Sequence, residues 1–266
     1  MHIAALNIHP IKGCQATAVD RVSVDRLGLV GDRRLMLVDG DGRFLSQREI
    51  PRLATVHPVI DVEAIRVTAP GCAAFELTVN PAGEPRPVSV WARDGIIAAD
   101  QGDCAAEWFS RAVGEPSRLV YFGPRARNPV DPDYSPRADA ETAFTDGYPI
   151  MATLAESLDD LNSRLAEPVP MARFRPSVVV SGAAAWSEDA WNALRIGEII
   201  CDAVKPCARC SVTTTDQSSG ARHPEQEPLR TLGSFRTVAG LGAVFGQNIV
   251  PRGTGMLHVG DTVELL

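Results

Sequence analysis

Short runs of valine, isoleucine and leucine, separated by turn-forming residues, fill the chain from Ile3 to about Tyr121 and constrain its fold more than any other feature. β-Branched residues favour extended backbone, and Gly, Asp and Pro end each run before a helical stripe can develop. The sequence Asp39-Gly40-Asp41-Gly42 predicts a turn between strands at 34–38 and 43–47. We therefore expect a mainly β protein with a few helices.

Two segments depart from this pattern and predict helices. Residues 104–113 and 153–166 carry apolar side chains at helical spacing: Ala105, Trp108, Phe109 and Ala112 in the first, Leu154, Leu158, Leu161 and Leu165 in the second. Thr153 and Glu156 have the spacing of a capping box at the start of the second helix. The leucine stripe is typical of a helix packed on a core.

The segment 123–143 divides the chain. It contains Pro124, Pro129, Pro132 and Pro136 among Arg, Asp and Ala, a composition that cannot support a regular ladder. A single core stops growing at roughly 250 to 300 residues, so a chain of 266 residues favours two units. We expect one unit at 1–122, a linker or long loop at 123–143, and a second unit at 144–266 with strands at 177–181, 196–201 and 257–266.

Composition excludes several functional classes. Hydrophobic residues make up 45% and charged residues 22%, as in ordinary globular proteins. The net charge of -7 argues against nucleic acid or anionic lipid as a partner, so any anion site must be local. The first residues have neither the basic start nor the apolar length of a signal peptide or a membrane span. We expect a cytoplasmic protein.

The cysteines point to one place for chemistry. They occur at Cys14, Cys72, Cys104, Cys201, Cys207 and Cys210. Only Cys207 and Cys210 form a close pair, in a segment that also carries Lys205 and Arg209. A neighbouring positive charge favours the thiolate, which is both the nucleophile and the soft metal ligand. We expect at least one of the two thiols to be reactive.

The sequence around this cysteine pair argues against three other kinds of site. A zinc site would need four ligands, and His223 has no second His nearby. A thioredoxin-type dithiol would open a helix, whereas here Pro206 precedes the pair and the threonines at 213–215 after it favour a strand. An iron–sulfur cluster would need a longer cysteine series, so electrons for any redox chemistry must come from another protein or a diffusible donor. Two buried, inert cysteines remain an open alternative.

A second feature is a set of cations in otherwise apolar sequence where strands meet turns: Lys12, Arg33, Arg173 and Arg175. Cations at strand ends can converge on one anion, and the planar fork of arginine suits phosphate. The competing interpretation is that each is a solvated surface charge.

Taken together, eight ordered segments resemble proteins with a molybdenum cofactor sulfurase C-terminal (MOSC) domain preceded by an N-terminal MOSC β-barrel domain. The segments are His9–Lys12, Gly31–Arg33, Phe144–Asp146, Asp160–Arg164, Phe174–Pro176, Cys207–Cys210, Pro228–Leu232 and Phe245–Asn248. The resemblance spans nearly the whole chain and is closest to the mitochondrial amidoxime-reducing component and its bacterial relatives, which reduce N-hydroxylated compounds. It implies a β-barrel MOSC domain at 144–266 and a smaller β-barrel-like domain at 1–122.

The resemblance also implies a site. Cys210 matches the molybdenum ligand of the family, and Cys207 would be a neighbour without that role. The positions that would hold the molybdenum cofactor (Mo-molybdopterin) are Lys12, Gly13, Arg33, Asp146, Gly147, Tyr148, Arg175, Ser177, Arg209 and Asn248. Asp146 and Asp216 are the candidates for a catalytic proton relay. Gly13, Ser177 and Asn248 depart from the residues common in animal members.

These implications give three hypotheses. The leading one is a molybdenum cofactor-dependent reductase of small N-hydroxylated or N-oxide substrates, with electrons from a separate ferredoxin-like protein or flavin reductase. The second is a carrier of persulfide sulfur or of molybdenum cofactor that performs no turnover. The third is a binding module for a phosphorylated small molecule that uses the arginines alone.

Overall fold

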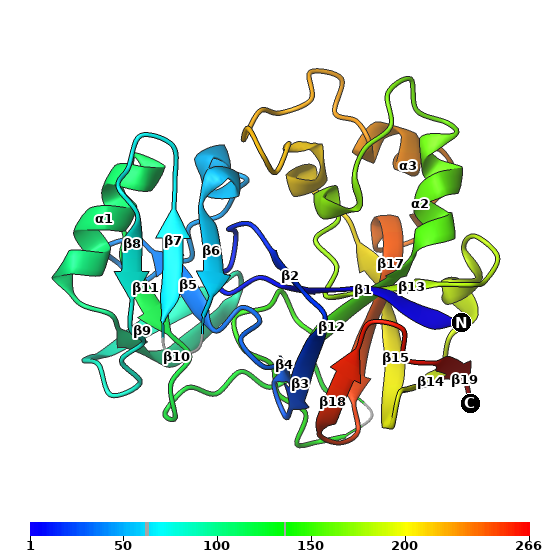
Figure 1. Ribbon diagram of the computed structural model, residues 1–266, viewed down its shortest axis with the longest axis horizontal. Coiled ribbons are helices and arrows are strands. Elements are labelled where there is room, and N and C mark those ends of the chain that lie inside the picture. Colours follow the sequence, from blue (N-terminus) through cyan, green and yellow to red (C-terminus); the bar gives the residue numbers. More distant parts are fainter. Residues whose placement is uncertain (62–63, 136) are drawn as a thin grey trace.

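The computed structural model describes residues 1–61, 64–135 and 137–266. The protein is mainly β, as the sequence predicts, and the strands in these residues form four sheets. Figure 1 shows two parts side by side, one containing α1 (Asp103–Val113) and the other containing α2 (Ala155–Asn162) and α3 (Leu229–Phe235). No helix of the described residues has the length and apolarity needed to cross a membrane.

The largest sheet has nine strands and lies in the part with α2 and α3 (Figure 1). Its order is β19 (Val263–Leu265), β14 (Ala193–Ile196), β15 (Ile199–Ala208), β17 (Gly242–Pro251), β12 (Ile150–Leu154), β13 (Val178–Ser181), β1 (His2–Ile8) and β2 (Thr17–Val19), with β16 (Thr237–Val238) paired to β17. β12 and β13 are parallel, and the other neighbours are antiparallel. Its apolar face forms a core around Ile3, Leu6, Val178, Leu194 and Ile249.

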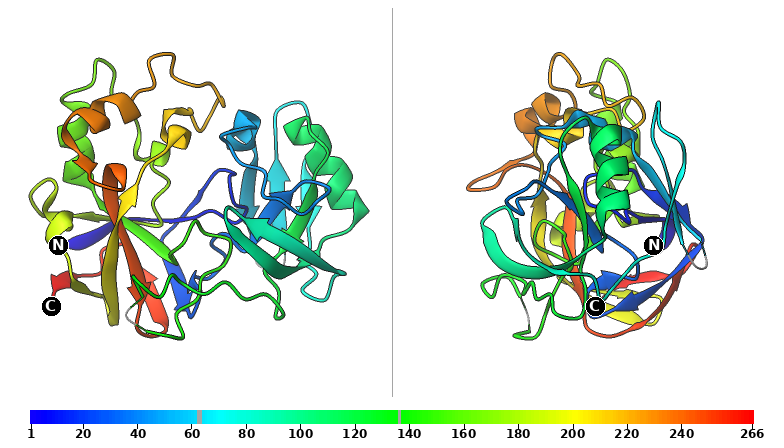
Figure 2. Two further views of the ribbon diagram at one scale, coloured as in Figure 1. Left: turned by 180° about the vertical axis from the view of Figure 1, so that it is seen from behind. Right: turned by 90° about the vertical axis from the view of Figure 1, so that its left-hand side faces the viewer.

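This sheet joins the two ends of the sequence. β1 pairs with β13 through His2 and Ser181 at one end and Leu6 and Val178 at the other. A bridge from His2 to Thr262 also brings β1 beside the start of β19, and the chain ends lie on the same part of the molecule in both views of Figure 2. The division into 1–122, 123–143 and 144–266 stays a prediction; the sheet itself takes strands from both sides of residues 123–143.

Three smaller sheets complete the fold. One has the order β5 (Leu35–Val38), β11 (Arg118–Tyr121), β10 (Arg93–Asp100) and β9 (Pro85–Val90). The others are β6 (His57–Ile60), β7 (Ile65–Thr68) and β8 (Phe75–Leu77), and β18 (Gly255–His258), β3 (Arg21–Asp25) and β4 (Gly28–Leu29). The expected turn at 39–42 forms, since Asp39 and Arg43 are joined by a backbone hydrogen bond. Its second arm is not a strand, however: the two arms meet at one antiparallel bridge, Val38 to Phe44, and β5 pairs along its length with β11.

The first predicted helix is confirmed, and the second is shorter than predicted. α1 buries Ala105, Trp108 and Phe109, as its periodicity requires. α2 begins at Ala155, and the expected capping box is wrong because Thr153 is the fourth residue of β12. Glu156 instead accepts hydrogen bonds from Ser181 Oγ and Gly182 N, both at 2.7 Å, so it ties α2 to the end of β13.

The threonine run after Cys210 is a 3-10 helix, η4 (Ser211–Thr214), where the sequence predicts a strand. The Thr213 hydroxyl donates to the Cys210 carbonyl at 2.8 Å, and the Thr214 hydroxyl donates to the Ser211 carbonyl at 2.7 Å. Threonine hydroxyls that bond to nearby carbonyls in this way compete with a strand ladder. The turn therefore directs the chain away from the sheet immediately after Cys210.

Candidate functional site

A cavity of about 310 Å³ collects almost all of the predicted site residues. Those in its wall are Lys12, Gly13, Arg33, Asp146, Gly147, Tyr148, Arg175, Ser177, Arg209, Cys210 and Asn248. They come from the segments beside β1, β5, β12, β13 and β15 and from β17 itself. Of the described residues in the wall, five are cations and one is a carboxylate, so the cavity is positive although the chain carries a net charge of -7.

Arg33 is fixed by acceptors on both of its terminal nitrogens. Nη1 donates to Asp32 Oδ2 at 2.5 Å and to Ser177 Oγ at 3.1 Å, and Nη2 donates to the carbonyl oxygen of Arg175 at 2.9 Å. The Ser177 hydroxyl in turn donates to Asp32 Oδ2 at 3.0 Å. These contacts lock the guanidinium group in the cavity wall.

Asp32, the anionic partner of Arg33, and its neighbour His9 are buried titratable groups. Burial disfavours the charge on Asp32, but Arg33 and hydrogen bonds from His9 outweigh it and hold the pKa of Asp32 below its usual range. Burial, together with the charges of Arg33 and Arg175, lowers the pKa of His9 to about 3. The network therefore contains an ionised Asp32 and a neutral His9 at physiological pH.

Arg33 and Arg175 share an unusual backbone conformation, with φ of 49° and 56°. Bulky residues rarely adopt positive φ, which costs about 1 to 3 kcal/mol unless the surroundings impose it. Arg175 Nη1 donates to Gln217 Oε1 at 2.9 Å, whereas Nη2 is buried without a hydrogen-bond partner among the described residues. Burial, with the charge of Arg33, lowers the pKa of Arg175 to about 10. The site thus holds a strained, incompletely satisfied cation.

Lys12 and Asp146 form an ion pair at the cavity wall, and Trp91 donates a hydrogen bond to the same carboxylate. Lys12 Nζ donates to Asp146 Oδ1, and Trp91 Nε1 donates to the same oxygen at 2.7 Å. The Lys12 side chain is 6% exposed and that of Asp146 is 73% exposed, so the carboxylate is open to the solvent within the cavity.

The pKa values of Lys12 and Asp146 are both shifted from their ordinary values. Burial lowers the pKa of Lys12, and Asp146 opposes that shift only in part. The surrounding cavity walls disfavour the charge on Asp146, but Lys12, the Trp91 hydrogen bond and Arg33 outweigh them and hold its pKa below the usual range. Asp146 is therefore ionised and accepts hydrogen bonds at neutral pH.

Both cysteines of the pair lie in the cavity wall and are partly exposed. Arg209 Nη1 contacts Cys207 Sγ at 2.9 Å, and Nη2 donates to the Phe174 carbonyl at 2.7 Å. Arg209 Nε is buried without a partner among the described residues. Cys210 is the residue directly before η4, so it lies in the cavity wall at the point where the chain leaves the sheet.

Asp216 does not line this cavity. Its Oδ1 accepts the backbone N–H groups of Ser218 and Ser219 at 3.0 and 2.9 Å, and its Oδ2 lies 3.3 Å from Arg173 Nη2. Hydrogen bonds from the two serines hold the pKa of Asp216 below its usual range. The carboxylate therefore stabilises the loop after η4, and Arg173 likewise bonds to this loop through the Thr214 carbonyl.

Sequence reasoning missed several wall residues, including Phe44, Ser46, Gln47, Trp91, Lys205 and Leu241. Trp91 lies between β9 and β10 with φ of 55°. Its ring makes a T-shaped contact with the ring of Phe44, with the two ring centroids 5.4 Å apart. An aromatic residue at a predicted turn carries no signal for a site by itself. Positive φ at Trp91, which only the structure shows, is the feature that sets it apart.

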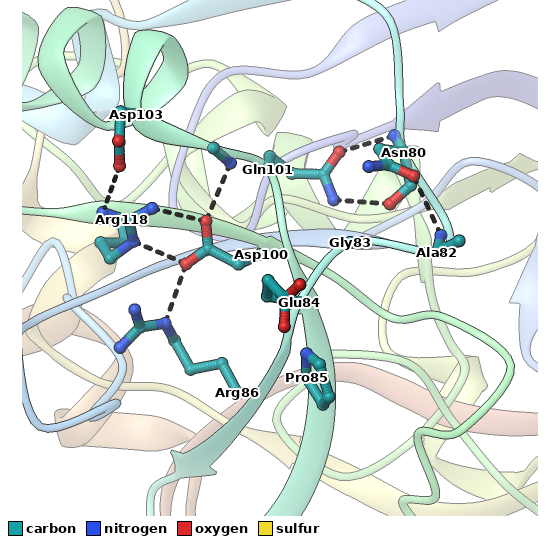
Figure 3. Close-up of a pocket in the computed structure, with 11 residues that line it drawn as sticks. Asn80, Ala82, Gly83, Glu84, Pro85, Arg86, Asp100, Gln101, Asp103 and Arg118 are labelled. Carbon is teal, nitrogen blue, oxygen red and sulfur yellow. Dashed lines mark hydrogen bonds and ion pairs between the residues drawn. The ribbon is translucent and has the colours of Figure 1, made fainter.

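A second concavity of about 550 Å³ lies beside the start of α1 (Figure 3). Its central group is Asp100, which accepts hydrogen bonds from Arg118 Nε at 2.6 Å, Arg118 Nη2 at 2.7 Å, Arg86 Nε at 2.8 Å and Gly102 N at 2.8 Å. Burial opposes the charge, but these donors lower the pKa of Asp100 to about 2. The charges here satisfy one another, unlike those of the first cavity.

The sequence matches two domain families. Residues 1–116 match the MOSC N-terminal beta barrel domain, and residues 139–264 match the MOSC domain. Mitochondrial amidoxime-reducing component 1 from Danio rerio is 32% identical over 273 residues, which cover 98% of this chain and 83% of the relative. The same component from Homo sapiens is 31% identical, covering 99% and 82%. Molybdenum cofactor sulfurase from Oryza sativa is 30% identical over 90% of this chain but only 31% of its own length.

Proposed function

The chain belongs to the MOSC-domain family, and from this premise we propose that it is a molybdenum cofactor-dependent reductase of N-hydroxylated compounds. The observation that carries the proposal is one cavity whose wall combines Cys210 with four cations, Lys12, Arg33, Arg175 and Arg209. The relatives named amidoxime-reducing components, which align over nearly the whole chain, support the choice of N-hydroxylated substrates.

The donors in this cavity fit the cofactor. Arg175 Nη2 and Arg209 Nε are buried N–H groups that lack acceptors among the described residues. Native proteins rarely leave such groups unpaired, and a phosphate supplies charged acceptors for arginine. We therefore assign the phosphate to Lys12, Arg33, Arg175 and Arg209, and the metal to the Cys210 thiolate.

Neutral groups and backbone complete the proposed cradle. Gly13, Gly147, Tyr148, Ser177 and Asn248 line the cavity and would contact the edges of the pterin. The Asn248 amide donates to the Lys205 carbonyl at 3.2 Å, so its side-chain oxygen remains available as an acceptor. Burial, followed by the nearby Asp131 and Tyr134, raises the pKa of Tyr148 to about 12, which keeps its hydroxyl protonated and able to donate.

When bound, the cofactor supplies the two-electron reduction that removes oxygen from the substrate N–O bond. The net reaction also consumes two protons and releases water. Lys12 Nζ carries a proton in contact with Asp146 Oδ1, and the Asp146 carboxylate is open to the cavity. We assign the proton relay to this pair rather than to Asp216, which lies outside the wall.

The electron donor in this proposal is a separate protein, ferredoxin-like or a flavin reductase. The six cysteines do not have the spacing of an iron–sulfur series, so the chain itself offers no ligand set for a second redox centre of that kind. The expected cytoplasmic location stays a prediction.

Paired cysteine variants test the proposal. After expression in a host that makes the cofactor, we expect roughly one molybdenum per chain and reduction of benzamidoxime with an artificial donor. Cys210→Ala should lose molybdenum and activity while its circular dichroism is unchanged. Cys207→Ala, three residues away in the same wall, is the matched control and should retain molybdenum. Full activity in Cys210→Ala would contradict the proposal.

A second candidate is a carrier of persulfide sulfur or of the cofactor without turnover. The identity to the rice molybdenum cofactor sulfurase favours it, although the aligned region is the smaller part of that relative. Intact mass spectrometry of native protein separates the two: one extra sulfur on a metal-free chain supports the carrier, and bound molybdenum with turnover supports the reductase.

A further inference from the structure

Lys205 is a cavity cation that the proposed cofactor does not use. The chain contains two lysines, Lys12 and Lys205, and both line the same cavity. Lys12 is paired with Asp146. Lys205 has no carboxylate partner among the described residues; its Nζ instead lies 3.7 Å from the centre of the Tyr134 ring. One lysine charge in the wall is thus neutralised, and the other is not.

The position of Lys205 is fixed by its surroundings. It lies on β15, the strand that carries Cys207 and leads to Cys210, and its carbonyl accepts a hydrogen bond from Asn248. The Tyr134 ring supports the ammonium group through a cation–π contact. Such a contact orients the group without cancelling its charge, because the ring carries no net charge. The ammonium group has no carboxylate partner among the described residues, so its N–H groups remain available to a ligand that reaches this part of the wall.

We propose that Lys205 is a specificity-determining residue that selects N-hydroxylated substrates carrying a carboxylate. The inference rests on the reductase function proposed above and names the substrate class for that site. Inside a concave wall the field of a cation is less screened than on open surface. A single ammonium balances a single negative charge, whereas phosphate is better matched by paired arginines such as those assigned to the cofactor.

Arg48 provides a matched control. Its guanidinium group lies 4.2 Å from the centre of the Trp91 ring, so it is also a cation supported by an aromatic ring. It too lacks a carboxylate partner in the part of the chain that the structure describes. Arg48 is exposed and does not belong to the cavity wall, however, while Lys205 does. Membership of the cavity wall is therefore the main difference between the two cations.

Binding measurements test the proposal. Calorimetry on cofactor-loaded protein without an electron donor compares benzamidoxime with 4-carboxybenzamidoxime. We expect the carboxylated compound to bind about fivefold more tightly, the ratio typical of one partly exposed ion pair. The ratio should fall to about one in Lys205→Gln and persist in Lys205→Arg and Arg48→Gln. A wild-type ratio of one, or an unchanged ratio in Lys205→Gln, overturns the proposal.

A second readout follows the two lysine side chains directly. Reductive methylation with carbon-13 preserves the lysine charge, and the two lysines give signals that the Lys205→Arg variant assigns. The carboxylated ligand should shift the Lys205 signal, and benzamidoxime should shift it much less; equal shifts contradict the proposal. If the preference is present but neither compound is reduced, the reductase function fails and the carboxylate site stands. If both compounds are reduced but neither binds preferentially, the reductase function stands and the carboxylate site fails.

Discussion

A hydrogen bond of 2.9 Å joins Arg33 Nη2 to the carbonyl oxygen of Arg175, 142 residues further along the chain. Both residues have positive φ, and both side chains face one cavity. Like charges repel, so their proximity requires anions. Asp32 supplies one on the protein side of Arg33, and the proposed cofactor phosphate would supply another in the cavity.

Removing the Arg33 charge should destabilise the protein even without a cofactor. The Asp32 side chain is 2% exposed, and Arg33→Gln leaves its buried charge without a cation. We expect the free energy of unfolding to fall by about 3 kcal/mol, measured by urea denaturation of metal-free protein. Arg66→Gln is the control, since the side chains of Arg66 and its partner Glu76 are 62% and 60% exposed. Loss of this exposed ion pair should lower the free energy of unfolding by at most about 0.5 kcal/mol. Equal costs would show that Arg33 is not structurally required.

His9 should make the protein sensitive to mild acid. Its pKa is about 3 in the folded state and 6.5 in a model peptide, so between these values the unfolded chain binds a proton that the folded chain does not. The free energy of unfolding therefore falls as the pH drops from about 6.5 toward 3, by up to about 1.4 kcal/mol per pH unit. Urea midpoints across this range should slope less in His9→Asn than in wild type. His258→Asn, on β18, controls for the substitution; parallel slopes in all three proteins would refute the prediction.

Asp100 should matter for stability and not for cofactor content. Its side chain is 7% exposed and bound to Arg86 and Arg118, so Asp100→Asn leaves two cations short of a partner and should cost about 2 to 4 kcal/mol. Because the folded pKa is lowered to about 2, this contribution is present above the ordinary Asp value and is lost as the pH falls through 2. Asp103→Asn, at a position 84% exposed, is the control. Loss of molybdenum in Asp100→Asn would link the two cavities and contradict this separation.

Thiol labelling should divide the cysteines into two groups. Burial raises the pKa of the Cys14 and Cys201 thiols to about 12, so both remain protonated and unreactive toward iodoacetamide at neutral pH. Cys104 is exposed, and Cys72, Cys207 and Cys210 are partly exposed. Peptide mass spectrometry of the native, cofactor-free protein should find label at these four positions and none at Cys14 or Cys201. Label on the buried pair before unfolding in urea would disprove the assignment.

The sequence predicts the fold class and the first helix because both depend on local periodicity. A continuous apolar run suffices for a buried strand such as β13, and α1 has an unbroken apolar face. The prediction of a capping box is wrong because Glu156 accepts hydrogen bonds from Ser181 and Gly182 instead. These two residues come close to Glu156 only when α2 packs on β13. The prediction of a strand at the threonine run is wrong because hydrogen bonds from the hydroxyl groups to nearby carbonyls outweigh the strand propensity of threonine.

The candidate site can be predicted from the sequence where its residues are close together, as Cys207, Arg209 and Cys210 are. The cations at strand ends also carry a recognisable pattern. The hydrogen bond of Trp91 to Asp146 and the contact of Lys205 with Tyr134 join distant segments, and neither residue type in isolation predicts its partner. Asp216 shows the reverse case, since a carboxylate near the cysteine pair in sequence turns toward its own loop.

The pairing of β1 with β13 has a consequence for biosynthesis. The ribosome makes His2–Ile8 long before it makes Val178–Ser181. β1 can therefore pair early with β2, but its edge toward β13 stays open while most of the chain is still absent. Its apolar side chains, Ile3 and Leu6, must stay uncovered or be shielded by a chaperone during that interval. An N-terminal fragment that stops at residue 116 would retain a recognisable domain sequence and β2 but would lack β13, the other neighbour of β1.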